Sequence, residues 1–593
     1  MAAFHLFNEL KRRNVLRAAV LYAGAVWALA QGISQLGPAA GAPDWATRWF
    51  LVAAVVGFPF WVAFAWFFEF TPSGLKRESE IDPADSIARS TSRKLNVGIF
   101  AVMAVAIVLL LTDRFVLHKD EIAAIPIKSI AVLPLTNESG NQDEQYFSDG
   151  LSDDLITALS QFAGLKVISR NSAFKFRDSK DDAKTIGMKL GVAHLLEGSV
   201  QHAGDAVRIS ARLINAADGS LVWSQQYDRP YQDLFKLQDD ITTAVAGALQ
   251  AKLLGGADTA TQSDRPPSGN LAAYNAYLQG KFYFARTTEA DLRKAIEAYT
   301  TATRLDPRYA LAYAGLSITW VTLAGQSLDG APAQQAFTQA SAAADTALAL
   351  EPNLAAAHIA RGTVLLNGDF NWTGAEAQYR RAVQLAPNDG PAKASLSTLL
   401  ATLGQPEPAV ELVRQALLTD PLHASWYNSL AAYLSGLGRL DEAERAIRKA
   451  IELQPGAIVY HTQLAIIAIQ RGDAKGALAA AQQEPAARGP WQETALALAQ
   501  QISGNRAAAD AALKTLIDTY SNLAAYQIAQ VYALRKDAEN MFAWLDRAWA
   551  SRDPGIRQLL YDPLVLRYQD DPRFAAFCHK VGLPTTTTAK AMP

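Results

Sequence analysis

Three patterns of apolar and polar residues follow one another along this chain of 593 residues, and each predicts a different kind of structure. Long apolar stretches occupy residues 18–36, 49–68 and 95–111. Short apolar runs then alternate with amphipathic segments over residues 128–254, and alanine-rich segments recur at a regular spacing beyond residue 271. The predicted fold class is multidomain: N-terminal transmembrane helices, a small α/β sandwich domain, and an all-α repeat solenoid.

The three apolar stretches predict a membrane region over residues 18–117. A helix that crosses the hydrocarbon core needs about 20 residues, with a range of about 17–25. The uncharged stretch 49–68 meets that length clearly, whereas 18–36 and 95–111 are at its lower end. A basic flank before residue 18 leaves a cleaved signal peptide open as an alternative for the first stretch. The later spans favour a retained helix.

The basic residues between these stretches predict the orientation. Cytoplasmic loops carry more Lys and Arg than loops on the other side of a membrane. Four basic residues lie in the N-terminal segment 1–17 and five lie between the second and third stretches, whereas Arg48 is alone in the first loop. We therefore expect the N-terminal segment in the cytoplasm of a bacterium. The large part beyond the third span is expected in the periplasm, anchored to the inner membrane.

The segment 128–254 predicts a compact domain with the element order β-α-β-α-β-β-β-α. Residues 129–135 form a continuous apolar run that is typical of a buried strand. Ser148 or Asp149 is expected to cap the first helix. Alternating residues over 207–213 predict a strand with one buried and one wet face. The last helix is expected over about 233–253.

Five short motifs in this domain carry a resemblance to a known family. In order they are Ile130-Ala131-Val132-Leu133-Pro134, Tyr146-Phe147-Ser148-Asp149-Gly150-Leu151, Val167-Ile168-Ser169-Arg170, Leu196-Glu197-Gly198-Ser199-Val200 and Val207-Arg208-Ile209. Together they resemble the TolB-amino-terminal-like domain, which many bacterial proteins carry between membrane helices and tetratricopeptide repeats. The resemblance implies no enzymatic activity. Related chains often carry a cyclase domain or a DNA-binding winged helix at the N-terminus, and about 17 residues before the first span are too few for either.

Residue chemistry adds no catalytic or metal site. Asp153 and Asp154 are adjacent, and neighbours on a helix point about 100° apart, so they do not form a paired-carboxylate site. Cys578 is the only cysteine, which excludes an internal disulfide. The net charge is −2, so no excess of positive charge favours nucleic acid. We expect no enzyme activity, no cofactor, no metal and no small-molecule substrate.

Prolines in similar contexts mark the repeats that follow a predicted linker, 255–270. From Pro352 onward the steps to Pro387, Pro421 and Pro455 are 35, 34 and 34 residues. The tetratricopeptide period is 34 residues. Gly404 and Gly438 are also one period apart, and glycine is expected to end the first helix of each hairpin. The array of seven or eight helical hairpins with a C-terminal cap is predicted over 271–583, followed by a disordered tail, 584–593. The cap motifs look like the ending common to the same repeat-bearing family.

Tetratricopeptide repeats present the first helix of each hairpin to a concave groove. The family's inward-facing positions, carried onto the repeat before Ala424, are Pro391, Ala394, Thr398 and Ala401. With the matching positions of the next two repeats they indicate a small and mildly apolar lining for a protein segment; the candidate binding residues are Ser425, Asn428, Ser435, Thr462 and Ile466. The alternative is that each of them packs on a neighbouring repeat. The predicted function is a membrane-anchored protein-binding scaffold or adaptor with an unidentified protein partner. The alternative function is a transmembrane signalling or regulatory protein related to the cyclase- or winged-helix-linked members.

Overall fold

The computed structural model describes residues 125–593 apart from 142–143, 250–251, 254–263, 329, 486–488, 591 and 593. Of the first 124 residues it describes scattered helical positions between 19 and 61 and two strands. The chain divides into two compact units, Met1–Ala124 and Ile125–Pro593.

In the first unit, the described positions connect the first two apolar stretches. The Tyr22 hydroxyl donates to the Ala54 carbonyl at 2.8 Å, and the Tyr22 ring lies 5.7 Å from that of Phe58. Strands β1 (Phe68–Thr71) and β2 (Gly74–Arg77) then form an antiparallel hairpin. The three predicted spans, at 18–36, 49–68 and 95–111, lie largely or wholly outside the described residues. Among the described residues, no helix is both long enough and apolar enough to cross a membrane.

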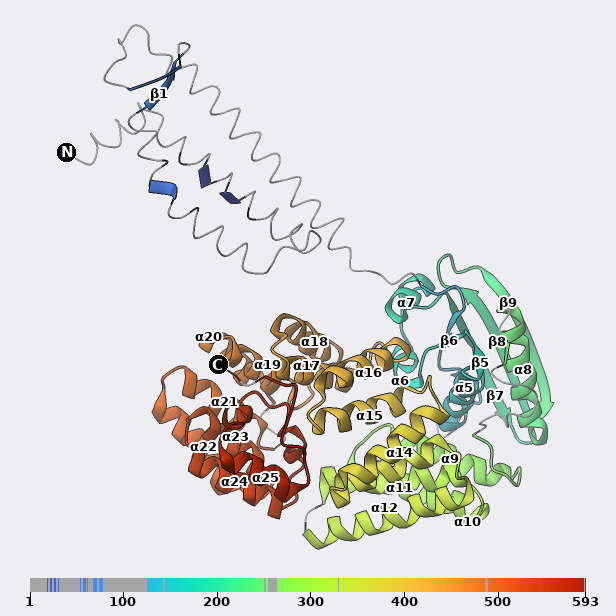
Figure 1. The fold of residues 1–593 in the computed structure, drawn as a ribbon. Helices are drawn as coiled ribbons and strands as arrows, with labels where there is room; N and C mark the ends of the chain where they lie inside the picture. Colours follow the sequence, from blue (N-terminus) through green and yellow to red (C-terminus); the bar gives the residue numbers. More distant parts are fainter. Residues whose placement is uncertain are drawn as a thin grey trace. The chain divides into compact units, whose positions relative to one another are not determined.

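The second unit begins with a six-stranded mixed sheet (Figure 1). Its main path runs β6-β3-β7-β8-β9, and β4 pairs with β7. The bounds are β3 Ser129–Val132, β4 Thr136–Asn137, β6 Lys166–Val167, β7 His194–Ala203, β8 Ala206–Asn215 and β9 Leu221–Pro230. β3 is parallel to β6 and β7, whereas β7, β8 and β9 form an antiparallel meander. The predicted alternation on 207–213 is confirmed, because Val207, Ile209, Ala211 and Leu213 are all buried.

The helices of this domain cover both faces of the sheet. α5 (Gln145–Leu159) and α8 (Leu234–Ala248) pack on one face, and α6 (Arg170–Ala173) and α7 (Ala183–Leu190) contact strands from the other. The elements follow the predicted order, but the predicted cap of the first helix is wrong. Ser148 and Asp149 lie inside α5, whose N-cap is Glu144. α8 ends at Ala248, earlier than predicted. Short strands β5 (Phe162–Ala163) and β10 (Lys252–Leu253) pair with each other.

Eight helical hairpins make up the described part of the array beyond residue 270. They pair α9 Leu271–Phe284 with α10 Glu289–Leu305, α11 Ala310–Ser327 with α12 Gly330–Leu350, α13 Ala355–Val364 with α14 Trp372–Leu385, α15 Gly390–Thr402 with α16 Pro406–Thr419, α17 Ala424–Gly436 with α18 Leu440–Leu453, α19 Tyr460–Gln470 with α20 Ala474–Gln483, α21 Trp491–Ile502 with α22 Arg506–Tyr520, and α23 Ala525–Leu534 with α24 Ala538–Ala550. The second repeat, α11 and α12, is longer than the others. Its extra residues lengthen these two helices and do not form a long loop between them.

Glycines set the angle between the two helices of most later hairpins. Gly404, Gly438, Gly472 and Gly504 follow the first helix of four successive repeats, all with φ between 73° and 75°. This left-handed conformation costs glycine little and ends a helix. Small residues fill the crossings, since Ala409, Ala443 and Ala477 are fully buried. The predicted helix-ending role of Gly404 and Gly438 is confirmed.

The α/β domain and the first repeats share one core. Leu151 on α5, Ile241 on α8, Tyr274 on α9 and Tyr299 on α10 belong to a single buried cluster. Gly150 lies against the Leu278 side chain, where a Cβ atom would clash. The sequence predicted two separate domains joined by the linker 255–270; the described part of that segment instead joins halves of one packed unit.

The C-terminal cap consists of η8 (Pro554–Gln558), η9 (Val565–Tyr568) and α25 (Pro572–Val581). Tyr526 on α23 donates to the buried Asp562 carboxylate at 3.0 Å, and Trp372 Nε1 donates to the Val581 carbonyl at 2.8 Å. The cap thus reaches back to α14 as well as to α23. The prediction of disorder beyond Pro584 is wrong for the described residues, because backbone hydrogen bonds hold that segment against earlier repeats.

Candidate partner-binding groove

The first helices of the fourth and fifth repeats form the open part of the predicted groove. A hollow of about 300 Å³ lies between α15 and α17. Its lining is Pro391, Ala394, Ser395, Ser397, Thr398, Val413, His423, Trp426 and Ser429. Three of these, Pro391, Ala394 and Thr398, lie at the positions that the sequence assigned to the inner face. The hollow carries no carboxylate, lysine or arginine on its walls.

An aromatic pair forms one wall of this hollow. The His423 and Trp426 rings are stacked, with centroids 4.0 Å apart and planes 4° from parallel. Burial lowers the pKa of His423 below its usual value, and the nearby Asp420 carboxylate opposes that shift only in part. His423 is therefore neutral at physiological pH. A flat, uncharged surface of this kind binds apolar and neutral polar groups.

The five predicted binding residues divide into two sets. Ser425 is exposed, and its Oγ lies 3.1 Å from Nδ1 of His423 at the rim of the hollow. Asn428 is half-buried, and its Oδ1 accepts no hydrogen bond from the described residues. Ser425 is therefore open to a ligand on α17, whereas the Asn428 Oδ1 atom is itself buried and out of a ligand's reach.

Ser435, Thr462 and Ile466 are buried, contrary to the prediction that they line an open groove. Ser435 Oγ donates to Gln470 Oε1 of the next repeat at 2.5 Å. The Thr462 N–H and hydroxyl both donate to the Glu484 carboxylate, at 2.7 and 3.0 Å. Packing on a neighbouring repeat, the alternative given by the sequence, is therefore confirmed for Ser435 and for Thr462, whose hydroxyl also lies 3.2 Å from the Trp491 carbonyl of the next repeat. Ile466 belongs to the buried core of the array. A charge placed at Ile466 would enter the core rather than a ligand contact.

The α/β domain contacts the turn that precedes the aromatic pair. Ser169 N–H donates to the Thr419 carbonyl at 2.8 Å, and the Leu422 N–H donates to Ser172 Oγ at 2.9 Å. The Ser172 hydroxyl also donates to the buried Asp420 carboxylate. α6 thus fixes the backbone just before His423. The sequence held no periodic signal for this contact, because its two sides lie about 250 residues apart.

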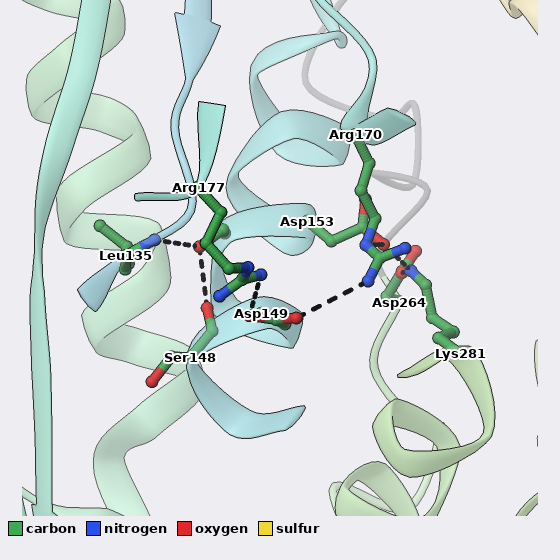
Figure 2. Close-up of polar contacts among 9 residues, drawn as sticks. Leu135, Ser148, Asp149, Asp153, Arg170, Arg177, Asp264 and Lys281 are labelled. Carbon is green, nitrogen blue, oxygen red and sulfur yellow. Dashed lines mark hydrogen bonds and ion pairs between the residues drawn. The ribbon is translucent and has the colours of Figure 1, made fainter. Parts of the chain in front are cut away.

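A buried charge cluster joins the α/β domain to the first repeat (Figure 2). Lys281 Nζ on α9 lies 2.6 Å from carboxylate oxygens of both Asp153 and Asp264. Arg177 donates to Asp149 at 2.6 Å, and Arg170 lies between Asp149 and Asp153 at 3.9 and 3.8 Å. Each carboxylate here faces a cation, which is the arrangement of a structural network.

This cluster also places Asp153 and Asp154 on different partners. Asp154 Oδ2 accepts a hydrogen bond from Gln238 Nε2 at 2.9 Å on the far side of α5. The two carboxylates therefore have different partners, as their adjacent positions on a helix predict. The sequence analysis did not predict this charge cluster. Its only sign in the sequence was the presence of the acidic residues Asp149 and Asp153 inside the apolar helix α5. Within the described residues, no group of His, Cys, Asp and Glu side chains is arranged to hold a metal ion.

Comparisons with known proteins match two regions of the chain. Residues 127–244 match the family described as HilA/YgeH-like transcriptional regulator, second domain, and residues 424–456 match the tetratricopeptide repeat. The C-terminal part is a tetratricopeptide repeat array. The resemblance of the α/β domain to the TolB-amino-terminal-like domain stays a prediction, since the matched family carries a different description.

One curated relative and several solved structures are similar to parts of the chain. The putative adenylate cyclase 3 of Rhizobium meliloti (strain 1021) is 35% identical over 199 residues, which cover 33% of this chain and 34% of that protein. The chain thus spans about a third of the length of that relative. YrrB, a TPR protein with an unusual peptide-binding site, is 20% identical over 37% of this chain and 99% of its own, with a TM-score of 0.26. The type IV pilus biogenesis factor PilW is 15% identical over 46% and 99%, with a TM-score of 0.28.

Proposed function

We propose that this protein is a non-enzymatic scaffold that binds a segment of another protein in the hollow between α15 and α17. The observation that carries the proposal is the uncharged hollow with its stacked His423–Trp426 wall, on the inner helices of a tetratricopeptide repeat array. Exposed Ser425 adds a neutral polar contact beside it. An aromatic wall with a few neutral polar groups suits a helix or an extended segment.

Site-specific photo-cross-linking tests this proposal. A photoreactive phenylalanine analogue at Ser425 of the full chain should cross-link one partner protein. The same analogue at Arg445, an exposed residue of α18, is the matched control and should not. Because apolar burial persists in salt and surface ion pairs weaken, cross-linking from Ser425 should still occur when binding and irradiation take place in about 0.5 M salt, where the screening length is below about 5 Å. A partner that cross-links only from Arg445, or only at low salt, contradicts the proposal.

We further propose that the protein is anchored in the bacterial inner membrane by the three apolar stretches, with residues 125–593 in the periplasm. The alternation of basic and poorly basic loops supports this orientation. A reporter that is active only in the periplasm should be active when fused after Lys128 and silent when fused after Lys76. The reverse result contradicts the orientation, and activity at both junctions contradicts the membrane-spanning arrangement between them.

The alternative function is signalling or regulation. The match of residues 127–244 to a domain of transcriptional regulators and the similarity to a putative adenylate cyclase support it. The bonds between α6 and the turn before His423 offer a physical link from the α/β domain to the hollow. Under this alternative, a cytoplasmic regulator should co-purify with the full chain, and its association should change when the Ser425 partner is present.

A further inference from the structure

The segment 584–592, here called the tail segment, lies against the fourth and fifth repeats; its described residues are 584–590 and 592. Its alternate backbone N–H groups donate to carbonyls of other parts of the chain. Thr588 N–H donates to Gly404 O at 3.1 Å, Lys590 N–H to Gly436 O at 2.6 Å, and Met592 N–H to Pro563 O at 2.8 Å. The described residues contain bends at Thr585 and Thr588 and no strand, so these bonds go to three separate carbonyls rather than to one partner strand.

The side chains of the tail segment follow the same alternation. Thr587 is half-buried and Ala589 is buried at 8% exposure, whereas Thr586, Thr588 and Lys590 are exposed. The Thr587 hydroxyl lies 3.0 Å from Gly404 O and 2.6 Å from Leu560 O. The inward positions therefore take one hydroxyl residue and, two positions later, one small residue.

The receiving surface consists of carbonyls at the ends of two inner helices, together with the cap. Gly436 is the last residue of α17, and Gly404 follows α15 with φ of 74°. The last four carbonyls of a helix have no partner within the helix, so they remain free to accept from another segment. A Cβ atom at Gly404 would lie 2.9 Å from the Thr586 oxygen, so glycine permits the close approach. A backbone carbonyl accepts from the N–H of any residue except proline, so these three bonds do not select a particular sequence.

We propose that this surface, defined by Gly404, Gly436, Leu560 and Pro563, is a second peptide-binding site. It takes a segment of a partner protein with Thr or Ser followed two positions later by Ala, Gly or Ser. The tail segment occupies the site as an intramolecular competitor. This inference rests on the proposed function, because it extends the scaffold's binding surface from the His423–Trp426 hollow to the opposite ends of the same two helices.

The contacts that hold the tail segment are few enough for a segment of a partner protein to replace it. Three backbone hydrogen bonds and two small inward side chains hold it, and most of its side chains are exposed. Its advantage over a free segment comes from its attachment to α25. A tethered segment has an effective concentration in the millimolar range for a short flexible connection. A partner must therefore compete with about that concentration of tail.

The test uses a labelled peptide with the sequence of residues 584–593 as the probe. A variant of the chain that ends at Leu583 should bind this probe saturably. If the probe's Kd is in the ten-micromolar range, the full chain should bind it about 100-fold more weakly, since the attached segment competes at millimolar effective concentration. A probe with Thr587→Val or Ala589→Arg should bind the shortened chain at least about tenfold more weakly. A probe with Thr588→Val is the matched control and should bind as well as the original.

A second variant guards against misfolding of the shortened chain. Full-length Ala589→Arg should expel the tail segment and bind the probe as the shortened chain does, whereas full-length Thr588→Arg should behave like the unmodified chain. Failure of both the shortened chain and Ala589→Arg to bind the probe overturns the proposal and leaves the tail as a structural strap. A dimer of the full chain that the truncation dissolves overturns it too, because the tail then occupies the site of a second copy.

The partner cross-linked at Ser425 should be recovered in larger amount with the shortened chain than with the full chain. Equal recovery refutes the claim that the tail competes with a partner. The probe experiment is independent of that partner, and Trp426→Ala should leave probe binding unchanged. Loss of partner binding with intact probe binding therefore refutes the proposed function alone.

Discussion

Replacing Lys281 with Met is expected to destabilise the unit 125–593 by about 3 kcal/mol. Removing one partner of a buried ion pair costs about 3–5 kcal/mol, because the remaining charge is left without compensation. Here two carboxylates, Asp153 and Asp264, lose the ammonium group that lies 2.6 Å from each. The Lys281 side chain keeps 22% of its surface exposed, so we expect the lower end of that range. Urea denaturation of the full chain, with hydrogen exchange of the α9 amides, measures the change.

Asp154→Asn is the matched control within the same cluster. Burial raises the pKa of Asp154 well above its usual value, and the neighbouring charges of Asp264 and Asp153 raise it further, against the opposing effect of Lys281. The four carboxylates of this region, Asp149, Asp153, Asp154 and Asp264, outnumber its three cations, Arg170, Arg177 and Lys281, so a proton on Asp154 balances the charge.

The sign of the pH dependence follows from that raised pKa. A carboxyl group whose folded pKa is raised contributes stability that is present below its unfolded pKa and is lost as the pH rises through its folded pKa. The amide of Asp154→Asn does not ionise, so the stability of this variant does not fall as the pH rises through the folded pKa of Asp154. The variant should match the wild type near pH 4 and become relatively more stable as the pH rises toward 9. Destabilisation by Asp154→Asn at high pH would mean that the ionised Asp154 is a partner of Lys281, which contradicts this account.

The sequence predicted the elements well because local patterns determine them. Strand alternation at 207–213 and the glycine and proline spacing of the repeats depend on neighbouring residues, and the structure confirms both. The cap of α5 was misplaced because Ser148 and Asp149 have capping side chains, yet both lie inside the helix, and of the two side chains only that of Asp149 has a tertiary hydrogen-bond partner. Arg177 binds Asp149, and the Ser148 carbonyl accepts from Ser152 (Figure 2).

The candidate site was predictable in part. The repeat phase placed Ala394, Thr398, Ser425 and Asn428 on the inner face of the array, and the hollow lies there. The repeat phase does not predict which other segments of the chain cover the inner face of the array. Thr462 turned inward onto Glu484, which follows α20 and carries no repeat signal. The tail segment was polar and looked unstructured, because its bonds run through the backbone, which composition does not reveal.

The second large effect concerns binding at the hollow. Trp426→Ala should weaken the partner captured at Ser425 by at least about 30-fold, since buried Trp anchors at interfaces contribute about 2 kcal/mol or more. The ring forms the wall stacked on His423, so its loss removes the flat surface itself. Trp426→Phe keeps an aromatic face and should lose less than about tenfold. Both variants should keep the melting temperature of the unmodified chain within a few degrees.

The affinity of that partner for the full chain with Trp or Ala at position 426, at about 0.5 M salt, tests the central claim most directly. The account predicts tight, salt-resistant binding to the unmodified chain and a loss of at least about 30-fold with Trp426→Ala at unchanged stability. Equal affinity for both chains, or binding to the unmodified chain that disappears in salt, would show that the partner does not use this hollow.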